Sequence, residues 1–530
     1  MKIFIKLHAV ALCMLAAFAA SCFIDDIVSP PNEDSYVPAE DEDKGIAKGN
    51  AWTVMAYLDG DNDLEYCLLN DVKEMKDGFI DDQDVNLIVL FDCAGAYSGY
   101  HNSKLTQDVF GSNFTVTRHY RIVNGKALRL IGFANGEMNM GDPKTLKNFI
   151  AYCKANYPAQ NYALVISDHG SGPMKKSLGG GSIGGGHSSL NKGVCSDDTN
   201  GDMMLTGAMS DTLTSAESVD LLIMDACLMS SIEFAYQFRN DNTNAGFKAK
   251  YMVASAPTVW GLGLDYKSIA EYLCNNHTTA GFGAKVLGEK IVKIQKTYTT
   301  KSYGGMEKAQ SFACLDMSKA ADVKAKVDAL ATELKNGGDD ERDAMYALRG
   351  KYSANNSNLP KVLHYFEAEY DSRLVTTLGS VSYSLEWLSS PFFDLYNLAK
   401  AINQDSSSNF SSEAKKKADA VMIAVDSMVT KSFANSYYTS SSYALLTFEA
   451  DKSGMHIVFP EGEREYDIGG GQMVNLWTGD YLWYSSDSYY YNGTNIFAFG
   501  NLHWCKSGNG GTVTWRDLLA GWWPLPSVNP

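Results

Sequence analysis

The chain has 530 residues, more than one ordinary hydrophobic core needs, so two or more domains are expected. Hydrophobic residues make up 45% of it and aromatic residues 12%, which is typical of a well-packed globular protein. Its formal net charge of −17 argues against nucleic acid as a partner and suits the attraction of basic substrates.

The N-terminus has the three-part form of an export signal. A basic start is followed by an apolar run over residues 9–20, and the small residues 19–21 directly precede Cys22. Small residues before a cysteine resemble the bacterial lipobox, in which the cysteine becomes the lipidated N-terminus. We expect residues 1–21 to be a lipoprotein signal peptide and Cys22 to anchor the protein in the bacterial cell envelope, at the outer membrane or cell surface. An ordinary signal peptide with secretion is the alternative.

Residues 22–50 are polar, acidic and contain three prolines, a composition that predicts a disordered tether. From residue 51 to about residue 300, short apolar runs alternate with segments of helical periodicity. Strands are predicted at residues 51–57, 85–91, 161–167, 219–224 and 251–256, and helices at residues 64–75, from Asp142 with Pro143 in its first turn, at 210–217 and at 229–239. A hairpin-like stretch is expected up to residue 131. This alternation predicts an α/β domain with a mostly parallel sheet and helices on both faces.

Residues 301–530 have a different character. Amphipathic helices are predicted at residues 318–334 and 411–428, and residues 435–505 are rich in Tyr, Ser and Gly with short alternating runs. We therefore expect a second, α+β domain in this part of the chain.

Two of the predicted strands end in residues that can carry chemistry. Residues 161–167 run into 168–172, Asp-His-Gly-Ser-Gly, and residues 219–224 run into 225–229, Asp-Ala-Cys-Leu-Met. Because the carboxyl ends of parallel strands meet at one edge of a sheet, His169 and Cys227 suggest a nucleophilic Cys/His dyad. A lone histidine or a lone buried cysteine is more often structural, but both residues within full motifs at two strand ends favour the dyad.

The chemistry of such a dyad makes demands on the surrounding backbone. A thiolate is favoured at a helix N-terminus, which Cys227 would occupy if a helix began at Met229. The backbone N–H groups of Cys227 and Gly170 are candidates for an oxyanion site. Gly170 and Gly172 would let the backbone pass close to a substrate carbonyl.

The two motifs resemble those of the clostripain-like cysteine peptidases, a family with the caspase-like fold. The resemblance covers residues 51–300, and more loosely the C-terminal part through residues 456–460. It implies that His169 is the general acid/base and that Cys227 is the nucleophile. Asp225 matches the acidic residue of the primary specificity pocket, where it would pair with a substrate Arg or Lys; a role in orienting the loop is the alternative.

The segment between the two motifs is expected to be an activation loop. Residues 172–193 are rich in glycine and contain little apolar material, which is typical of a flexible, exposed loop. The resembling family matures by cutting itself between the two motifs. Lys175, Lys176 and Lys192 are therefore candidate processing sites, with Lys175 or Lys176 favoured. A departure from the family lies at residues 256–261, where an acidic residue common in the family is missing.

No zinc-binding spacing appears and no cofactor is required by the sequence, so no metal ligand is predicted. Residues 59–63 and 197–202 look faintly like calcium loops, but neither has the complete EF-hand pattern. Calcium dependence occurs in the resembling family, which makes Ca²⁺ a candidate, with turn formation as the alternative. The cysteines beyond Cys22 lack C-x-x-C spacing and are expected to be mostly small core residues.

These observations predict an exported cysteine endopeptidase that cleaves protein or peptide substrates after Arg or Lys through a thioester, and is activated by self-cleavage. One alternative is a non-catalytic surface lipoprotein that binds its partners on a peptidase fold. The other is a caspase-like peptidase or transpeptidase of different specificity. The intact His169 and Cys227 argue against the first alternative, and Asp225 argues against the second.

Overall fold

In a computed structural model, the chain divides into Met1–Lys44 and one compact unit, Gly45–Pro530. The structure describes residues 50–79, 84–96, 98–134, 136–173, 193–240, 246–302, 310–349, 362–365, 375–378, 381–384, 391–435, 448–459, 465–467, 473–475, 499–507 and 512–522. The expected signal peptide, Cys22, nearly all of the expected tether and the three candidate processing lysines lie outside the described residues.

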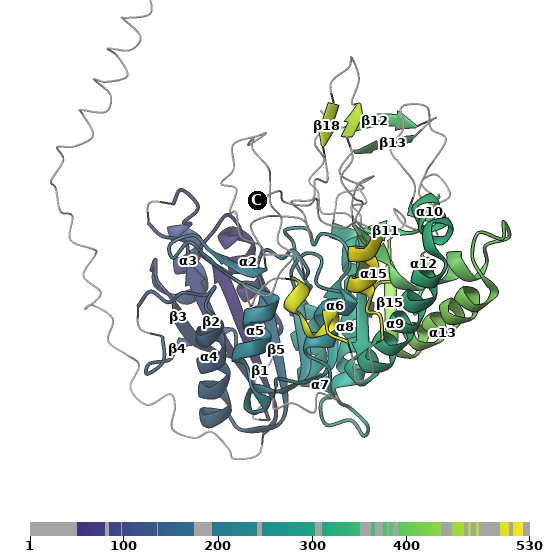
Figure 1. Ribbon diagram of the computed structural model, residues 1–530. Coiled ribbons are helices and arrows are strands. Elements are labelled where there is room, and N and C mark those ends of the chain that lie inside the picture. Colours follow the sequence, from purple (N-terminus) through teal and green to yellow (C-terminus); the bar gives the residue numbers. More distant parts are fainter. Residues whose placement is uncertain are drawn as a thin grey trace, which may run out of the picture. The chain divides into compact units, whose positions relative to one another are not determined.

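A nine-stranded sheet forms the centre of this unit, with the strand order β15-β10-β9-β8-β5-β1-β2-β3-β4 (Figure 1). The five central strands are parallel, and two antiparallel strands extend the sheet at each edge. Their bounds are β1 Asn50–Gly60, β2 Val85–Cys93, β3 Arg118–Val123, β4 Lys126–Arg129, β5 Ala159–Ser167, β8 Val219–Asp225, β9 Ala249–Ser255, β10 Ser311–Asp316 and β15 Val429–Ala434.

Helices cover both faces of the sheet, and the helices of each face pack on a separate hydrophobic cluster. One face carries α2 Glu65–Gly78, α3 Ser103–Phe110, α7 Tyr266–Asn276 and α8 Ala284–Ser302. The other carries α4 Pro143–Asn156, α5 Thr206–Thr212, α6 Ile232–Gln237, α9 Ala320–Asn336, α12 Leu395–Asn403 and α13 Ser412–Met428. Two further helices are α10 Gly338–Arg349 and α15 Trp515–Trp522. The predicted fold class, a mostly parallel sheet between two helical layers, is confirmed.

The central strands read as continuous apolar runs because both of their faces are covered. Every residue of β2 and of β8 is buried. The start of α4 is also as predicted, since Asp142 accepts a hydrogen bond from the Lys144 N–H at 2.9 Å and Pro143 occupies the first turn.

The structure does not divide the chain at residue 300. Strands β10 and β15 both come from the part beyond that residue, yet they extend the central sheet next to β9. The other described strands of the C-terminal part form one three-stranded and two two-stranded antiparallel sheets. They are β11 His364–Tyr365, β14 Phe392–Asp394 and β16 His456–Val458, then β12 Val375–Leu378 with β13 Val381–Ser384, and β17 Glu465–Asp467 with β18 Met473–Asn475.

Two predicted helices differ from the observed ones. The helix predicted at residues 210–217 is instead α5 and a separate 3₁₀ turn, Ser215–Glu217, whose start is capped by Thr214. The helix predicted from Met229 begins only at Ile232, where Ser231 accepts a hydrogen bond from the Phe234 N–H. The hairpin-like stretch before residue 131 also contains the short helix α3, which the prediction missed.

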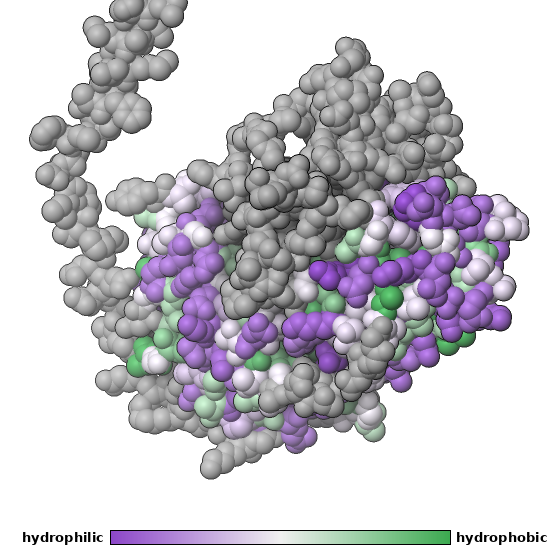
Figure 2. All heavy atoms as spheres, in the orientation of Figure 1, coloured by the Kyte–Doolittle hydropathy of each residue, from purple (hydrophilic) through white to green (hydrophobic). Residues whose placement is uncertain are grey.

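Most cysteines are core residues, as expected. The eight cysteines from Cys67 onward form no disulfide, and five of them are buried: Cys93, Cys153, Cys195, Cys314 and Cys505. Hydrophilic and hydrophobic residues are interspersed on the described part of the face that Figure 2 shows. No helix within the described residues combines the length and the apolar character that crossing a bilayer requires.

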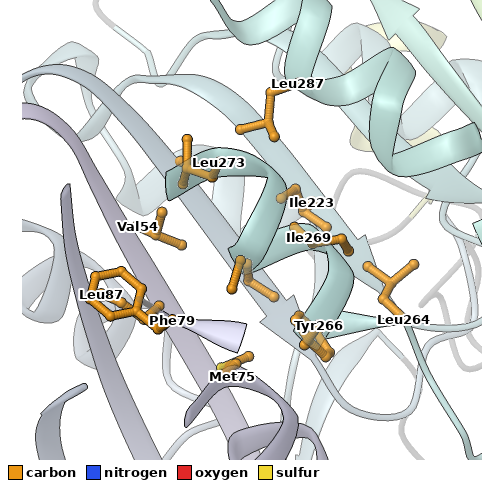
Figure 3. Close-up of a pocket in the computed structure, with 13 residues that line it drawn as sticks. Val54, Met75, Phe79, Leu87, Ile223, Leu264, Tyr266, Ile269, Leu273 and Leu287 are labelled. Atoms are coloured by element: carbon orange, nitrogen blue, oxygen red, sulfur yellow. The ribbon is translucent and has the colours of Figure 1, made fainter. Parts of the chain in front are cut away.

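A small apolar cavity of about 40 Å³ lies between the sheet and helices α2 and α7. Figure 3 shows its lining, which includes Val54, Leu273 and Tyr266. An apolar lining of this kind offers no partner to a charged side chain. We therefore regard the cavity as a feature of core packing.

Candidate active site

The two motifs begin at neighbouring positions on neighbouring strands. Strands β5 and β8 are parallel, and their last paired residues are Ser167 and Asp225. His169 and Cys227 each follow two residues later, so both emerge at the same carboxyl edge of the sheet. This is the edge at which catalytic loops converge in α/β folds.

The two loops then touch through their backbones. A β-carbon placed on Gly170 would lie 2.5 Å from the carbonyl oxygen of Cys227 and 2.8 Å from its amide nitrogen. A β-carbon on Gly172, whose φ is +66°, would lie 2.7 Å from the carbonyl oxygen of Leu228. Only glycine fits at these two positions. The structure thus places the loop that carries His169 against the loop that carries Cys227.

The imidazole of His169 is oriented by a carboxylate from another strand end. Its Nε2 lies 2.7 Å from Oδ1 of Asp63, in the loop between β1 and α2. Because an ionised carboxylate only accepts hydrogen bonds, this contact places the ring proton on Nε2. The bond from His169 also lowers the pKa of Asp63, so Asp63 stays ionised.

The neighbouring Asp168 makes hydrogen bonds to other segments of the chain. It is buried, and its carboxylate accepts hydrogen bonds from the Ser196 N–H and from the side chain of Asn62, the latter at 2.8 Å. Asn62 also donates to the carbonyl oxygen of Ser196 at 2.8 Å. Asp168 therefore ties the His169 loop to the β1–α2 loop and to strand β6, Val194–Asp197.

Cys227 is partly buried and contacts the loop that follows β9. The Val259 N–H donates to its Sγ at 3.3 Å, and the thiol donates to the carbonyl oxygen of Val259 at 3.6 Å. The expected helix N-terminus behind Cys227 is wrong, because α6 begins only at Ile232. In its place, Leu228 adopts a left-handed conformation with φ of +63°, which is uncommon for a branched residue and typical of functional turns.

Residues of the C-terminal part of the chain hold this turn in place through hydrogen bonds. His456 donates from Nε2 to the carbonyl oxygen of Leu228 at 2.9 Å, and Ser230 donates to the carbonyl oxygen of Gly454 at 2.6 Å. The ring of His456 also lies 3.7 Å from the position of a β-carbon on Gly172. His456 therefore contacts both the histidine loop and the cysteine loop.

Asp225 and Asp71 form a buried acidic pair. Its Oδ2 accepts hydrogen bonds from the Tyr266 hydroxyl at 2.8 Å and the Leu264 N–H at 3.1 Å, whereas its buried Oδ1 has no hydrogen-bond partner among the residues that the structure describes. A β-carbon on Gly263 would lie 2.8 Å from that Oδ2 and 3.4 Å from both carboxylate oxygens of Asp71. The two carboxylates thus face the same glycine.

No cation of the described residues neutralises this pair. Burial raises the pKa of Asp225 to about 6. Burial first, and the charge of Asp225 second, raise the pKa of Asp71 well above its usual range. Two buried carboxylates without a counter-ion are costly, so their arrangement calls for a positive group from outside.

The sequence matches the clostripain family over residues 56–507. The chain belongs to the clostripain family. It is a cysteine endopeptidase of that family, and clostripain of Hathewaya histolytica is 35% identical to it over 512 residues, which span 90% of this chain and 87% of that protein.

Solved structures of low identity resemble the same chain. A secreted C11 cysteine protease from Bacteroides thetaiotaomicron, in complex with an irreversible peptide inhibitor, is 17% identical, with a TM-score of 0.49 and coverage of 79% of this chain and 95% of that one. An inactive zymogen C11 protease from Parabacteroides distasonis is 15% identical, with a TM-score of 0.48 and coverage of 79% and 94%.

The sequence predictions did not include three residues of this clostripain-family site: Asp63, Asp71 and His456. Asp63 and Asp71 stand in or beside a predicted helix, where acidic residues usually serve as solvated surface. His456 stands in a short buried strand far along the chain. Their proximity to the two motifs arises only from tertiary packing.

Proposed function

We propose that this clostripain-family enzyme is an exported endopeptidase that cuts after Arg or Lys, with Cys227 as nucleophile and His169 as general acid/base. The observation that carries the proposal is the contact of Gly170 with the backbone of Cys227, beside a buried pair of carboxylates that no cation of the described residues contacts. The contact between the two loops supports the proposed reaction, and the carboxylate pair supports the proposed preference for basic residues.

The reaction follows from these positions. Nδ1 of His169 takes the proton of Cys227, and Sγ attacks the scissile carbonyl carbon. The backbone N–H groups of Cys227 and Gly170 are the proposed donors to the oxyanion. His169 then gives its proton to the leaving amine, and a thioester remains. Water, deprotonated by His169, cleaves the thioester to a carboxylic acid and restores the thiol.

The specificity follows from Asp225 and Asp71. A guanidinium or ammonium group beside them supplies a positive charge that both carboxyl groups lack, whereas an uncharged side chain leaves them without a cation. Asp71 supplies a second carboxylate although residues 256–261 contain no acidic residue. Leu262 is exposed and lies next to Gly263, so an apolar rim borders the proposed pocket.

Self-cleavage in the segment 172–193 remains part of the proposal. Its described ends are both fixed at the site, since the Ser171 N–H donates to the carbonyl oxygen of Gly193 at 3.0 Å and Gly170 bridges to Val194. Lys175, Lys176 and Lys192 lie between these anchored ends, so a cut after any of them meets the proposed specificity. We further propose lipidation at Cys22, with a signal peptide before it and anchoring in the cell envelope.

Expression of residues 23–530 as wild type and as Cys227→Ala tests the catalytic proposal. The wild type is expected to appear as two fragments and to hydrolyse reporter peptides that end in Arg or Lys, but not matched peptides that end in Asp or Gln. Cys227→Ala is expected to stay intact and inactive. Wild-type protein that stays uncut and inactive, with calcium supplied, would contradict the proposal. Faster turnover of the Asp-ended peptide would contradict the proposed pocket.

A further inference from the structure

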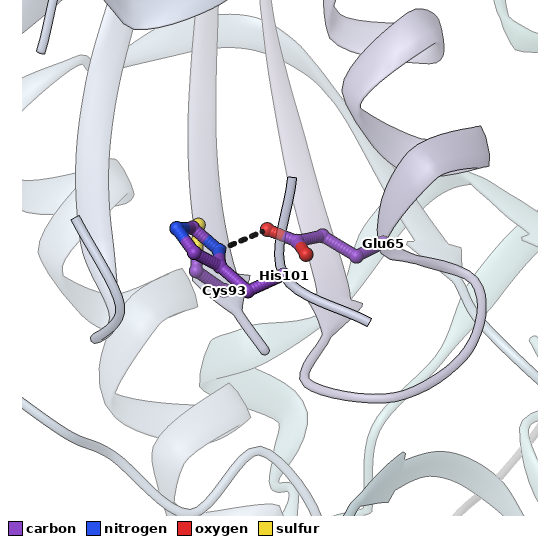
Figure 4. A group of neighbouring side chains, drawn as sticks. All are labelled: Glu65, Cys93 and His101. Carbon is purple, nitrogen blue, oxygen red and sulfur yellow. Dashed lines mark hydrogen bonds and ion pairs between the residues drawn. The ribbon is translucent and has the colours of Figure 1, made fainter. Parts of the chain in front are cut away.

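A glutamate, a cysteine and a histidine from three segments converge at the start of α2 (Figure 4). Glu65 is the first residue of α2, Cys93 is the last residue of β2, and His101 lies in the loop before α3. One potential ligand atom of each residue lies within 4.8 Å of those of the other two. The separation of these residues along the chain matches no metal-binding motif, so only the folded structure brings them together.

The group is enclosed by protein and contains a carboxylate that needs a positive partner. Glu65 and Cys93 are completely buried, and only 9% of the His101 side chain is exposed. No lysine or arginine of the described chain makes an ion pair with Glu65, whose ionic contact is with His101. A buried carboxylate without a permanent cation is costly, so a proton or a metal ion has to balance its charge.

Both nitrogen atoms of His101 face oxygen atoms. Nδ1 lies 2.9 Å from Oε1 of Glu65, and Nε2 lies 2.9 Å from Oδ1 of Asn113. A neutral imidazole carries a proton on only one nitrogen. When Nε2 donates to Asn113, the lone pair of Nδ1 points at the carboxylate, and a cation is needed between the two. Metal-bound histidines have this arrangement, in which the other ring nitrogen donates to an oxygen atom.

Cys93 adds a sulfur ligand to the group. Its thiol interacts with the side chains of Glu65 and Thr106. Burial first, and then the charges of Glu65 and Asp92, raise the pKa of this thiol well above its usual range. Without a metal ion the thiol therefore stays protonated and unreactive. A coordinated metal ion would displace the thiol proton into solution.

We propose that Glu65, Cys93 and His101 bind one zinc ion. Sulfur and imidazole ligands favour zinc over calcium or magnesium, which prefer oxygen ligands. The ligand atoms of a tetrahedral zinc ion lie roughly 3.5 Å apart, so small shifts of the three side chains complete the arrangement. Water takes the fourth position, as in other zinc sites with three protein ligands.

The ion would join three segments next to the proposed catalytic histidine. Glu65 follows Asp63 by two residues, and Asp63 orients the imidazole of His169. The Asn102 N–H donates to Oε2 of Glu65 at 3.0 Å, which leaves Oε1 for the ion, and the Asn102 side chain caps α3. Zinc would therefore fix the starts of α2 and α3 to the end of β2, and limit the movement of the loop that carries Asp63.

The test measures metal binding in the Cys227→Ala form of residues 23–530, so it does not depend on the proposed peptidase reaction. After metal is removed with EDTA, calorimetry is expected to show a single zinc ion bound per chain. Zinc chloride should also raise the Tm by several degrees, because it binds the folded protein. Cobalt chloride should give the near-ultraviolet absorption of a cobalt–thiolate bond. Calcium chloride in excess should displace neither ion.

Two variants of this form test the ligands. His101→Ala changes a side chain near the surface, and it should weaken zinc binding by roughly a hundredfold or more. Cys93→Ser should abolish the cobalt–thiolate absorption. Cys67→Ser is the matched control, because Cys67 lies on the same helix but is not part of the group. It should bind zinc and cobalt like the parent.

The proposal would be overturned by a parent protein that does not bind zinc, since a proton shared by Glu65 and His101 would then account for their contact. Zinc binding of unchanged strength in His101→Ala would also overturn it, as would a cobalt complex of the parent without the thiolate absorption. Circular dichroism of each variant shows whether a loss of binding reflects a lost ligand in a folded protein.

Discussion

Nε2 of His456 donates a hydrogen bond of 2.9 Å to the carbonyl oxygen of Leu228, the residue that directly follows the proposed nucleophile, across 228 positions of sequence. Burial lowers the pKa of His456 to about 3, so the ring is neutral and its Nε2 proton is committed to this bond. The left-handed turn at Leu228 is thus fixed from the far end of the chain. The C-terminal part is therefore a support of the catalytic loop.

His456→Ala should lower the free energy of unfolding by about 2–4 kcal/mol, because it leaves a cavity and an unpaired carbonyl oxygen. It should also lower kcat/KM. His456→Gln, whose amide can donate to the same oxygen, should recover part of both. The measurements are urea unfolding and hydrolysis of an Arg reporter peptide. Normal activity in His456→Ala would contradict the supporting role.

The acid sensitivity of the fold should also depend on His456. In the unfolded chain this residue takes up a proton near pH 6.5, whereas the folded protein excludes the proton down to about pH 3. The unfolded state therefore binds more protons in this window, and stability falls as the pH is lowered through it. His456→Gln should make the loss of stability between pH 6.5 and pH 4 shallower, as measured by urea midpoints.

Asp63→Asn should lower kcat by about 10- to 100-fold and leave KM nearly unchanged, because Asp63 holds the imidazole and does not contact the substrate. The acidic limb of the kcat/KM profile should move to lower pH, since a neutral amide stabilises the imidazolium less. Asp63 is half exposed, so stability should change by no more than about 0.5 kcal/mol. An unchanged pH profile would show that Asp63 has no role in catalysis.

Gly170→Ala should lower kcat/KM by roughly a hundredfold or more, because the new methyl group would lie 2.5 Å from the carbonyl oxygen of Cys227 and force the two loops apart. Gly283→Ala is the matched control, since a β-carbon there meets no atom within 4 Å. Steady-state kinetics on both variants make the comparison. Equal activities would mean that the two loops do not need this contact.

The sequence predicted the central strands and both motifs because buried parallel strands leave a local apolar signature. The turn after Cys227 could not be predicted in this way. Residues 228–231 have helical composition, but Leu228 takes a left-handed φ and Ser230 bonds to Gly454, so tertiary contacts override local propensity. Asp71 was not predicted for a related reason, since the sequence of its helix does not indicate which acidic side chain lies near Asp225.

Asp71→Asn provides the sharpest test of the proposed pocket, because activity and stability should change in opposite directions. Burial raises the pKa of Asp225 to about 6, so at this residue the folded protein binds more protons than the unfolded chain between about pH 4 and pH 6, and stability falls as the pH rises through this window. Burial and the charge of Asp225 raise the pKa of Asp71 too, so its contribution has the same sign. At neutral pH, Asp71→Asn should raise the free energy of unfolding by about 1–3 kcal/mol, since it replaces an ionisable group that is costly to bury beside Asp225 with a neutral amide.

The same variant should lower kcat/KM for Arg and Lys reporters by about a hundredfold, because a cationic side chain loses one of its two partners. In the wild type, kcat/KM for these reporters should fall as the pH is lowered through about 6, where Asp225 takes up a proton and the pocket loses charge. The measurements are the free energy of unfolding in urea and kcat/KM for the reporters, both on one preparation of Asp71→Asn. A purely structural Asp71 would give the reverse pattern, a less stable protein with unchanged preference for basic residues.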